Sequence, residues 1–303
     1  MTAPPGPVVA SLPGVARLPS PIQPITDPGL GAAAFNLIVK RDDLISADFP
    51  GNKWRKLALN LQAARDGGHR TLLTFGGAYS NHVRATAAAG VVFGFGTIGV
   101  IRGEEHQPLN PSLRYAADRG MYLAYLDRAS YRRKTEPEVL AGLRDRFGEF
   151  YLLPEGGSNA LAARGCAEVT AELSAQVAFD VLCVPCGTGG TLAGVAAGLA
   201  AGQRAIGFSA LRGGGRFLPA AVRALQDEAF GGPRGDWRID DEFHFGGFAR
   251  RSPELDGFID AFRARHGLIL DRIYVAKMMY GIYAHSARGT FAPGSTVVAV
   301  ITG

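Results

Sequence analysis

Strand-like and helix-like segments alternate along this chain, and that alternation limits its fold more than any other feature of the sequence. The apolar run "FDVLCVP" leads through "CGTGG" into the Ala-rich stretch "TLAGVAAGLA", and "TLLTFGG" leads in the same way into "SNHVRATAAAGVVFG". Apolar runs that end in glycines are typical of buried strands, and the stretches that follow have helical spacing. Strands that alternate with helices form parallel sheets with helices on both faces. The sequence therefore predicts an α/β fold.

Length and two breaks in the pattern predict how this fold is divided. The 303 residues are enough for two globular domains. Soft boundaries fall at "SADFPGN" and at "PEGGSN". We therefore expect a large discontinuous domain of residues 1–47 and 157–303 and a small inserted α/β domain of residues 48–156. A cleft between two such units is the default site for a ligand.

Charge, hydropathy and cysteine content exclude several classes of protein. The net charge of +5 is mild and no dense Lys/Arg block is present, which argues against nucleic-acid binding. No apolar stretch predicts a membrane span, and the N-terminus lacks a signal-peptide pattern, so we expect a cytoplasmic protein. Cys183 and Cys186 have C-x-x-C spacing, but the apolar run around them predicts buried thiols rather than a redox or metal site.

The segment "PCGTGGTLAG" is the first of several that carry chemistry. Its glycines let the backbone approach a ligand closely, and the helix that follows offers free N–H groups and a positive dipole end. Thr188 and Thr191 add hydroxyl groups. The spacing is that of neither a Walker loop nor a dinucleotide fingerprint. The segment predicts a phosphate site, with a plain tight turn as the alternative.

The segment "PGNKWRKL" places Lys53 at the start of a helix, with Asn52 as the predicted N-cap. A helix N-terminus disfavours an ammonium group and therefore favours the neutral amine, which is the form that attacks a carbonyl. Taken alone, an exposed surface lysine is the commoner outcome. Lys56 lies one helical turn further on, and we expect it to point away from the loop.

The segment "FGGAYSNH" follows a predicted strand and opens a helix with Ser80, Asn81 and His82. Backbone N–H groups and short polar side chains at such a position suit a carboxylate. Simple N-capping by Ser80 or Asn81 is the structural alternative, and the two roles are compatible. The segment "PEGGSN" is similar but less specific, and is equally consistent with a hinge.

Together these motifs carry a family resemblance. The segments "KRDDL", "GNKWRKL", "GGAYSNHVRATAAA", "PEGGSN", "PCGTGGTLAG" and the final "TG" occur in an order and at distances that resemble the 1-aminocyclopropane-1-carboxylate (ACC) deaminase / D-cysteine desulfhydrase family. The resemblance runs from about Phe35 to the last residue. It implies a pyridoxal phosphate (PLP) enzyme of the tryptophan synthase β-like fold, with two open parallel-sheet domains and an active site in the cleft between them.

The resemblance also implies a role for individual residues. Lys53 matches the lysine that holds PLP as a Schiff base and later moves protons. Ser80 matches a serine near the substrate carboxylate that serves as nucleophile or as acid or base, and Tyr274 matches a tyrosine that acts as acid or base. Asn81 matches the partner of the PLP phenolic oxygen, and Thr302 matches a hydroxyl that faces the pyridine nitrogen. The predicted phosphate loop comprises Gly187, Thr188, Gly189, Gly190 and Thr191. His82 completes the predicted substrate contacts of Ser80, Asn81 and Tyr274.

Departures from the family pattern bear on the substrate. The ACC-opening branch has Gln where this chain has His82, and a carboxylate where it has Val275. Phe245 stands near the place of a second family tyrosine, and Tyr79 stands where desulfhydrases often have Gln. These differences favour β-elimination from a small amino acid such as D-cysteine, giving a keto acid and ammonia. ACC deamination, or PLP binding with little catalysis, are the alternatives. The resemblance further implies a homodimer.

Overall fold

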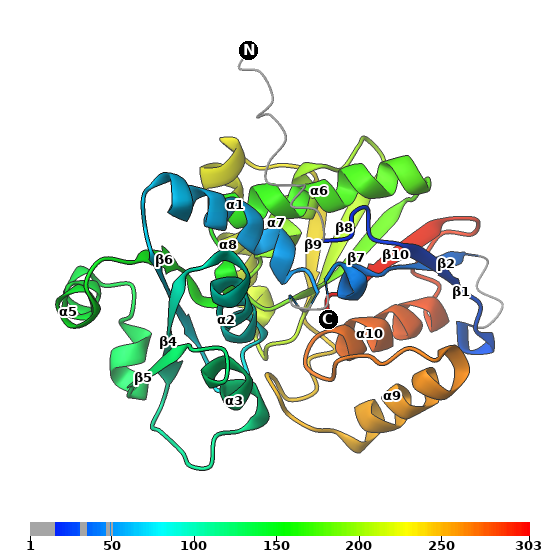
Figure 1. Cartoon of the computed structure of the whole chain (residues 1–303). Coiled ribbons are helices and arrows are strands. Elements are labelled where there is room, and N and C mark those ends of the chain that lie inside the picture. Colours follow the sequence, from blue (N-terminus) through cyan, green and yellow to red (C-terminus); the bar gives the residue numbers. More distant parts are fainter. Residues whose placement is uncertain (1–15, 31–34, 47–48, 50) are drawn as a thin grey trace.

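Two separate β-sheets organise the part of the chain that the computed structural model describes, residues 16–30, 35–46, 49 and 51–303 (Figure 1). The first is six-stranded, in the order β1-β2-β10-β7-β8-β9. Its strands are Ile22–Ile25, Asn36–Lys40, Thr296–Val300, Val181–Cys186, Arg204–Ser209 and Asp236–Asp240. The second is four-stranded, in the order β5-β4-β3-β6. Its strands are Tyr122–Leu126, Gly96–Arg102, Thr71–Gly76 and Tyr151–Leu153.

All strand pairs of the described residues are parallel except β1 with β2. The antiparallel strand lies at a sheet edge, where Pro24 is tolerated because one side of an edge strand needs no ladder hydrogen bonds. The central strand β7 is buried along its whole length, as expected of a strand covered on both faces. The predicted α/β fold with two parallel-sheet units is confirmed.

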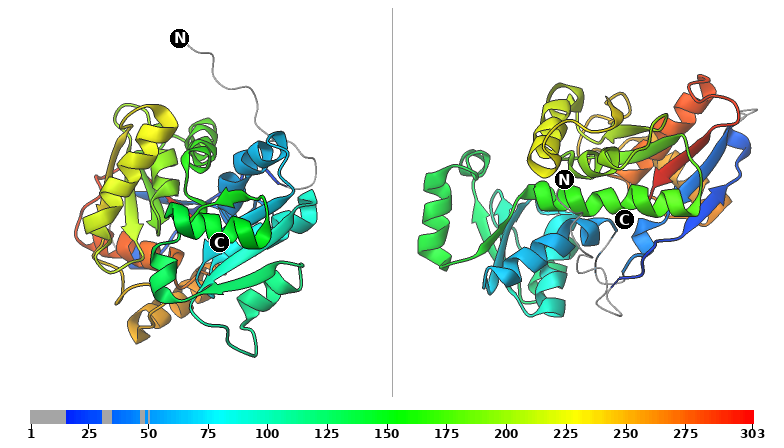
Figure 2. Two further views of the ribbon diagram at one scale, coloured as in Figure 1. Left: turned by 90° about the vertical axis from the view of Figure 1, so that its left-hand side faces the viewer. Right: turned by 90° about the horizontal axis from the view of Figure 1, so that it is seen from above.

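Helices cover both faces of the six-stranded sheet (Figures 1 and 2). Alternate residues of β7 point to opposite faces, because side chains along a strand alternate. Val181 and Cys183 pack in one cluster with α9 and α10, whereas Leu182 and Val184 pack in the other with α6, α7 and α8. These five helices span Pro253–His266, Val275–Ala287, Ala160–Gln176, Gly190–Ala197 and Gly214–Phe230.

The four-stranded sheet has its own covering helices (Figure 1). Helices α1, α2 and α3 pack on one face and α4 and α5 on the other. They span Lys53–Asp66, Asn81–Phe93, Pro111–Ala117, Arg128–Arg132 and Pro137–Phe147. This whole sheet falls inside 48–156 and every strand of the larger sheet falls outside it. The domain boundaries themselves stay a prediction.

Three further observations on the described residues concern membrane spans, metal sites and reactive thiols, which the sequence argued against. No helix among them is long and apolar enough to cross a membrane. No group of three or more His, Cys, Asp or Glu side chains among them is arranged to hold a metal ion. Cys183 and Cys186 are free and buried, as the apolar run predicted, and burial raises the pKa of both thiols.

A buried ion network joins α1 to the six-stranded sheet. The Arg55 guanidinium donates to both carboxylate oxygens of Asp42, at 2.8 and 2.9 Å, and to both oxygens of Glu172 on α6, at 2.8 and 2.9 Å. Lys40, at the end of β2, lies 2.9 Å from Glu172. The side chains of Arg55, Asp42 and Lys40 are fully buried. Each charge in the network therefore depends on its partners to offset the cost of leaving water.

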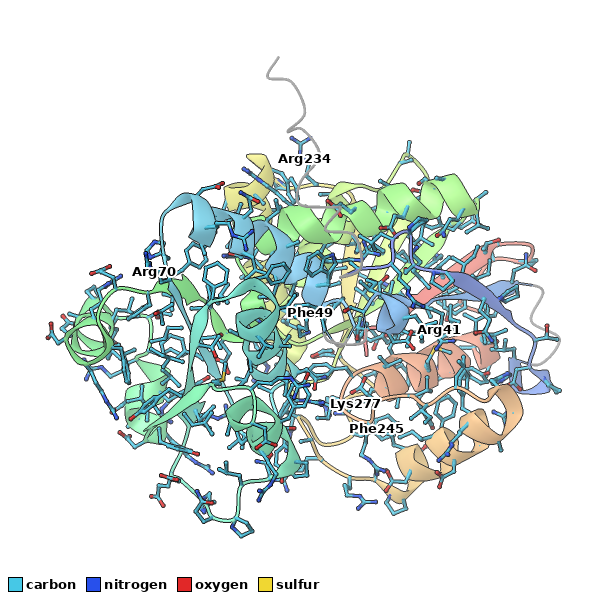
Figure 3. The ribbon with its side chains drawn as sticks, viewed as in Figure 1. Arg41, Phe49, Arg70, Arg234, Phe245 and Lys277 are labelled. Atoms are coloured by element: carbon cyan, nitrogen blue, oxygen red, sulfur yellow. The ribbon has the colours of Figure 1, made fainter. Side chains whose placement is uncertain are left out.

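Replacing Arg55 should consequently destabilise the protein strongly. We expect Arg55→Ala to lower the free energy of unfolding by about 3–5 kcal/mol, because Asp42 is left charged and unpaired in the interior. The matched control is Arg41→Ala (labelled in Figure 3), which removes a more exposed pair with Asp43 and should cost about 0–1 kcal/mol. Chemical denaturation of both variants tests this. Equal losses would mean that the network carries no special weight.

Candidate active site

A cavity of ≈ 500 Å³ lies where the two sheets face each other. Its walls come from segments that follow the carboxyl ends of β3, β4, β6, β7, β8 and β10, the usual position for ligands in open α/β sheets. The volume is within the usual range for ligand pockets, about 300–1,000 Å³. The cavity brings together all the sequence-predicted site residues, namely Lys53, Ser80, Asn81, His82, Gly187, Thr188, Gly189, Gly190, Thr191, Tyr274 and Thr302.

Lys53 is the first residue of α1 and lines this cavity. Its Nζ donates to Asn52 Oδ1 at 3.1 Å, and Asn52 Nδ2 donates to Thr191 Oγ1 at 2.8 Å. Asn52 stands at the N-cap position but its side chain caps no helix N–H group. The predicted capping role of Asn52 is therefore wrong, because its amide instead links the lysine to the glycine loop.

The electrostatic surroundings favour the neutral amine of Lys53. Burial is the main cause and the nearby Lys56 ammonium is the second, and together they lower the pKa of Lys53 to about 7. A desolvated lysine beside another cation is the arrangement that produces a nucleophilic amine near neutral pH. The fully exposed lysine, which was the commoner outcome for the isolated motif, is not what the fold produces.

The glycine loop between β7 and α7 is shaped by close approach of other chain segments. Gly189 has φ of +83°, and a Cβ at Gly190 would lie 2.6 Å from Ser158 Oγ. The backbone conformation at Gly189 therefore favours glycine, and a side chain at Gly190 would have to displace Ser158. Ser158 and Thr188 share a 2.6 Å hydrogen bond beside the loop. Because the first N–H groups of α7 lack partners within the helix, the loop and the start of α7 are suited to a dianion.

Lys56 belongs to this loop region, contrary to the sequence-based expectation. Its Nζ donates to the Gly156 carbonyl at 3.0 Å and to Ser158 Oγ at 3.1 Å, and it lines the cavity. Burial lowers its pKa. The error came from treating one helical turn as a change of direction, whereas residues three apart lie on the same face of a helix. The three-residue spacing between Lys53 and Lys56 was the signal in the sequence that puts both side chains on one face of the helix.

Ser80, Asn81 and His82 stand at the start of α2 and line the cavity. Ser80 Oγ accepts the Val83 N–H at 3.3 Å, so the predicted N-cap is confirmed. Asn81 Nδ2 donates to the Gly303 carbonyl at 3.4 Å. The His82 ring is 1% exposed, and neither of its nitrogens has a hydrogen-bond partner among the described residues. Burial, together with Lys53 and Lys56, holds the pKa of His82 well below its usual value, so the ring is neutral.

Tyr274 and Thr302 complete the polar lining. A Cβ at Gly187 would lie 3.0 Å from the Tyr274 ring, which places the tyrosine against the glycine loop. Burial raises the pKa of Tyr274, so its hydroxyl stays protonated. The Asp271 carboxylate accepts the Tyr274 N–H at 2.9 Å and fixes the start of α10. The Thr302 carbonyl accepts the Asn52 N–H at 3.0 Å, which ties the C-terminal segment to the lysine.

Two side chains singled out by the sequence lie elsewhere. Phe245, labelled in Figure 3, packs against Tyr280 of α10, with ring centroids 4.9 Å apart, and does not line the cavity. Phe248 of the same segment lines it instead and contacts the Tyr274 ring edge to face at 6.0 Å. Val275 is fully buried in the core. Sequence reasoning missed Phe248 and also Arg102, the last residue of β4, which lines the cavity.

These residues fit PLP. The cofactor carries a phosphate dianion, which the glycine loop, the α7 N-terminus and Lys56 are suited to hold. It carries an aldehyde, which requires a neutral lysine amine such as that of Lys53. The unpartnered nitrogens of His82 leave hydrogen-bonding capacity that a ligand in the cavity can use. Thr302 supplies a neutral hydroxyl.

Comparisons with known proteins agree with this fit. The chain is 31% identical over 260 residues to a Thermotoga maritima protein whose name gives ACC deaminase as a provisional activity, covering 82% of this chain and 83% of that one. It is 27% identical over 303 residues to a D-cysteine desulfhydrase from Klebsiella pneumoniae, covering 94% and 91%. A crystal structure described as an ACC deaminase homologue superposes with a TM-score of 0.80 at 27% identity, covering 97% and 93%.

The sequence model of one enzyme family spans the same region. It is described as pyridoxal-phosphate dependent enzyme and matches residues 16–303. The family resemblance and the PLP cofactor predicted from the motifs are thereby confirmed. The chain belongs to the pyridoxal-phosphate dependent enzyme family.

Proposed function

We propose that this protein is a PLP-dependent lyase that removes a β-substituent and the amino group from a small amino acid, with D-cysteine as the model substrate. The observation that carries the proposal is the buried Lys53 amine, which faces the cavity beside the glycine loop and has a pKa of about 7. The D-cysteine desulfhydrase of Klebsiella pneumoniae, which covers 94% of this chain, supports the choice of substrate.

The pKa values of Lys53 and Tyr274 divide acid and base roles between them. Because its pKa is lowered to about 7, Lys53 becomes neutral as the pH rises above 7 and can then accept the proton from the substrate Cα. Tyr274 stays protonated because burial raises its pKa, so it can donate a proton but is a poor base. Sequence reasoning left both roles open to Tyr274. Two titratable groups whose environments push their pKa values apart are the usual basis of an acid–base pair.

The remaining residues bind and orient. PLP, when bound, supplies an electron sink that stabilises negative charge at Cα. Ser80 and the first N–H groups of α2 orient the substrate carboxylate, and Asn81 and His82 line the same wall. In the overall reaction an amino acid with a β-leaving group and one water give a keto acid, ammonia and the protonated leaving group. For D-cysteine these products are pyruvate, ammonia and hydrogen sulfide.

The lining favours β-elimination over cyclopropane opening. Val275 is buried in the core, so the position that carries a carboxylate in the ACC-opening branch contributes nothing to this cavity. The uncharged side chain of Thr302 lines the cavity instead. A hydroxyl holds a proton on a pyridine nitrogen less firmly than a carboxylate does. A weaker electron sink suffices when the leaving group is good.

ACC deamination is the second candidate. Two observations favour it, the 31% identical Thermotoga maritima relative and the ACC deaminase homologue that superposes with a TM-score of 0.80. Both candidates use the same lysine and the same phosphate site, so the fold alone does not separate them. The homodimer and the cytoplasmic location expected from the sequence are proposals of the same kind.

Removing the Lys53 amine should abolish both cofactor attachment and turnover. We expect Lys53→Ala to lack the visible absorption band that lysine-bound PLP gives and to form keto acid at least roughly a hundredfold more slowly, the scale of a lost proton-transfer group. Lys56→Gln is the comparison, because it alters the neighbouring amine but should keep the band at saturating PLP. A band that survives in Lys53→Ala but not in Lys56→Gln would assign the attachment to Lys56.

The rate at which PLP attaches to the cofactor-free protein should depend on pH. Because the pKa of Lys53 is lowered to about 7, the ammonium form dominates below that pH and the reactive amine above it. We expect the rate to fall about tenfold per pH unit below 7 and to level off above about pH 8. Stopped-flow absorbance measures it. A rate that rises steadily to pH 10 would indicate an ordinary, solvated lysine.

Product assays with two substrates separate the two candidate functions. The PLP-loaded protein should form pyruvate and hydrogen sulfide from D-cysteine, and little 2-oxobutyrate from ACC. The reverse result would establish ACC deamination and contradict our weighting of Val275 and Thr302. A visible band with no keto acid from either compound would support the third sequence-based alternative, PLP binding with little catalysis.

A further inference from the structure

We infer that Arg102 is a substrate-binding residue that receives the carboxylate of the amino acid, an inference that rests on the proposed function. None of the sequence motifs included this arginine. It is the last residue of β4, it is exposed at the rim, and it lines the cavity. The guanidinium sets the affinity for the substrate rather than the rate of the chemical step.

Strand register explains how Arg102 reaches the cavity. Strands β3 and β4 are parallel, and Gly76 pairs with Ile101, so Arg102 lies beside Gly77 at the carboxyl end of the sheet. A Cβ placed on Gly77 would lie 3.6 Å from Arg102 Nη2. The segment that begins at Gly77 ends three residues later at Ser80, the N-cap of α2. The guanidinium therefore stands beside the turn that leads into this helix.

The charges around the cavity leave Arg102 available for a ligand. No ion pair in the described part of the chain includes Arg102. Glu155, the acidic residue that lines the cavity, pairs with Lys134 at 3.1 Å. The Tyr131 ring lies under the guanidinium, 5.8 Å away, and Tyr131 is 2% exposed, so the ring gives Arg102 a rigid support. Contact with the ring leaves the N–H groups of the Arg102 guanidinium free to donate hydrogen bonds to a ligand.

The other cations of the lining are occupied differently. Lys56 donates to Gly156 and Ser158 beside the glycine loop, and the pKa of the Lys53 amine is lowered to about 7, so Lys53 loses its charge as the pH rises above 7. The Arg102 guanidinium presents planar donors that match a carboxylate. The free N–H groups at the start of α2 favour an anion on the same wall. A carboxylate between the Arg102 guanidinium and the N-terminus of α2 accepts hydrogen bonds from both.

The test compares three variants of the PLP-loaded protein. Arg102→Gln removes the charge, Arg102→Lys keeps it without the fork, and Arg119→Gln is the matched control. Arg119 belongs to the same region and stacks on a tyrosine, Tyr115, at 3.6 Å, but does not line the cavity. We measure KM and kcat for D-cysteine, the inhibition constant of propionate, which has a carboxylate but no amino group, and the affinity for PLP.

We expect Arg102→Gln to raise KM and the propionate inhibition constant in parallel by about tenfold or more, the effect of one lost charge-assisted hydrogen bond. Its kcat and PLP affinity should change less than about twofold, Arg102→Lys should recover part of the loss, and Arg119→Gln should behave as wild type. An unchanged propionate constant in Arg102→Gln would overturn the inference, as would an equal effect of Arg119→Gln.

The design separates this inference from the proposed function. If wild type forms no keto acid from D-cysteine, the proposed function fails, and propionate binding is then measured by isothermal titration to the same PLP-loaded variants. Weaker propionate binding by Arg102→Gln in that assay would still support a carboxylate site at Arg102. Equal binding by wild type and Arg102→Gln would refute the carboxylate site whatever the substrate proves to be.

Discussion

The buried contacts of Arg55 hold the functional helix in place. Arg55 lies two residues after Lys53 in α1, and its guanidinium bonds to Asp42, which follows β2, and to Glu172 on α6. Because three side chains of this network are fully buried, α1 cannot rotate without stranding a charge in the interior. The direction in which the start of α1 presents its side chains is therefore set by charges that lie outside the cavity.

The chemistry of the cavity follows from that orientation. One face of α1 presents Lys53 and Lys56, so the two amines share a desolvated region beside the glycine loop. Burial lowers the pKa of both amines, and the Lys56 ammonium lowers that of Lys53 further. Segments far apart in the chain close the site around them. The Thr302 carbonyl accepts the Asn52 N–H, and the described C-terminus lies at the centre of the molecule (Figure 1).

Local patterns predicted the parts of this site that belong to one segment. Glycine at Gly189 and Gly190, a lysine at a helix start and an N-cap at Ser80 are each recognisable because a turn or helix end has its own chemical requirements. The predictions that went wrong concern directions across segments. Asn52 bonds to Thr191 rather than capping α1. Phe248, which no sequence motif singled out, lines the cavity. Neither contact is determined by residues that are neighbours in the sequence.

The sequence by itself determined the alternating α/β fold, the family and its cofactor, because periodicity and the ordered motifs are local properties that survive in one dimension. The tertiary structure alone decided that the Lys56 amine bonds to Gly156 and Ser158 and that Arg102 reaches the cavity rim. It also decided that both nitrogens of His82 lie buried without a partner among the described residues. Those outcomes depend on strand register, burial and charge from distant segments, which no single motif contains.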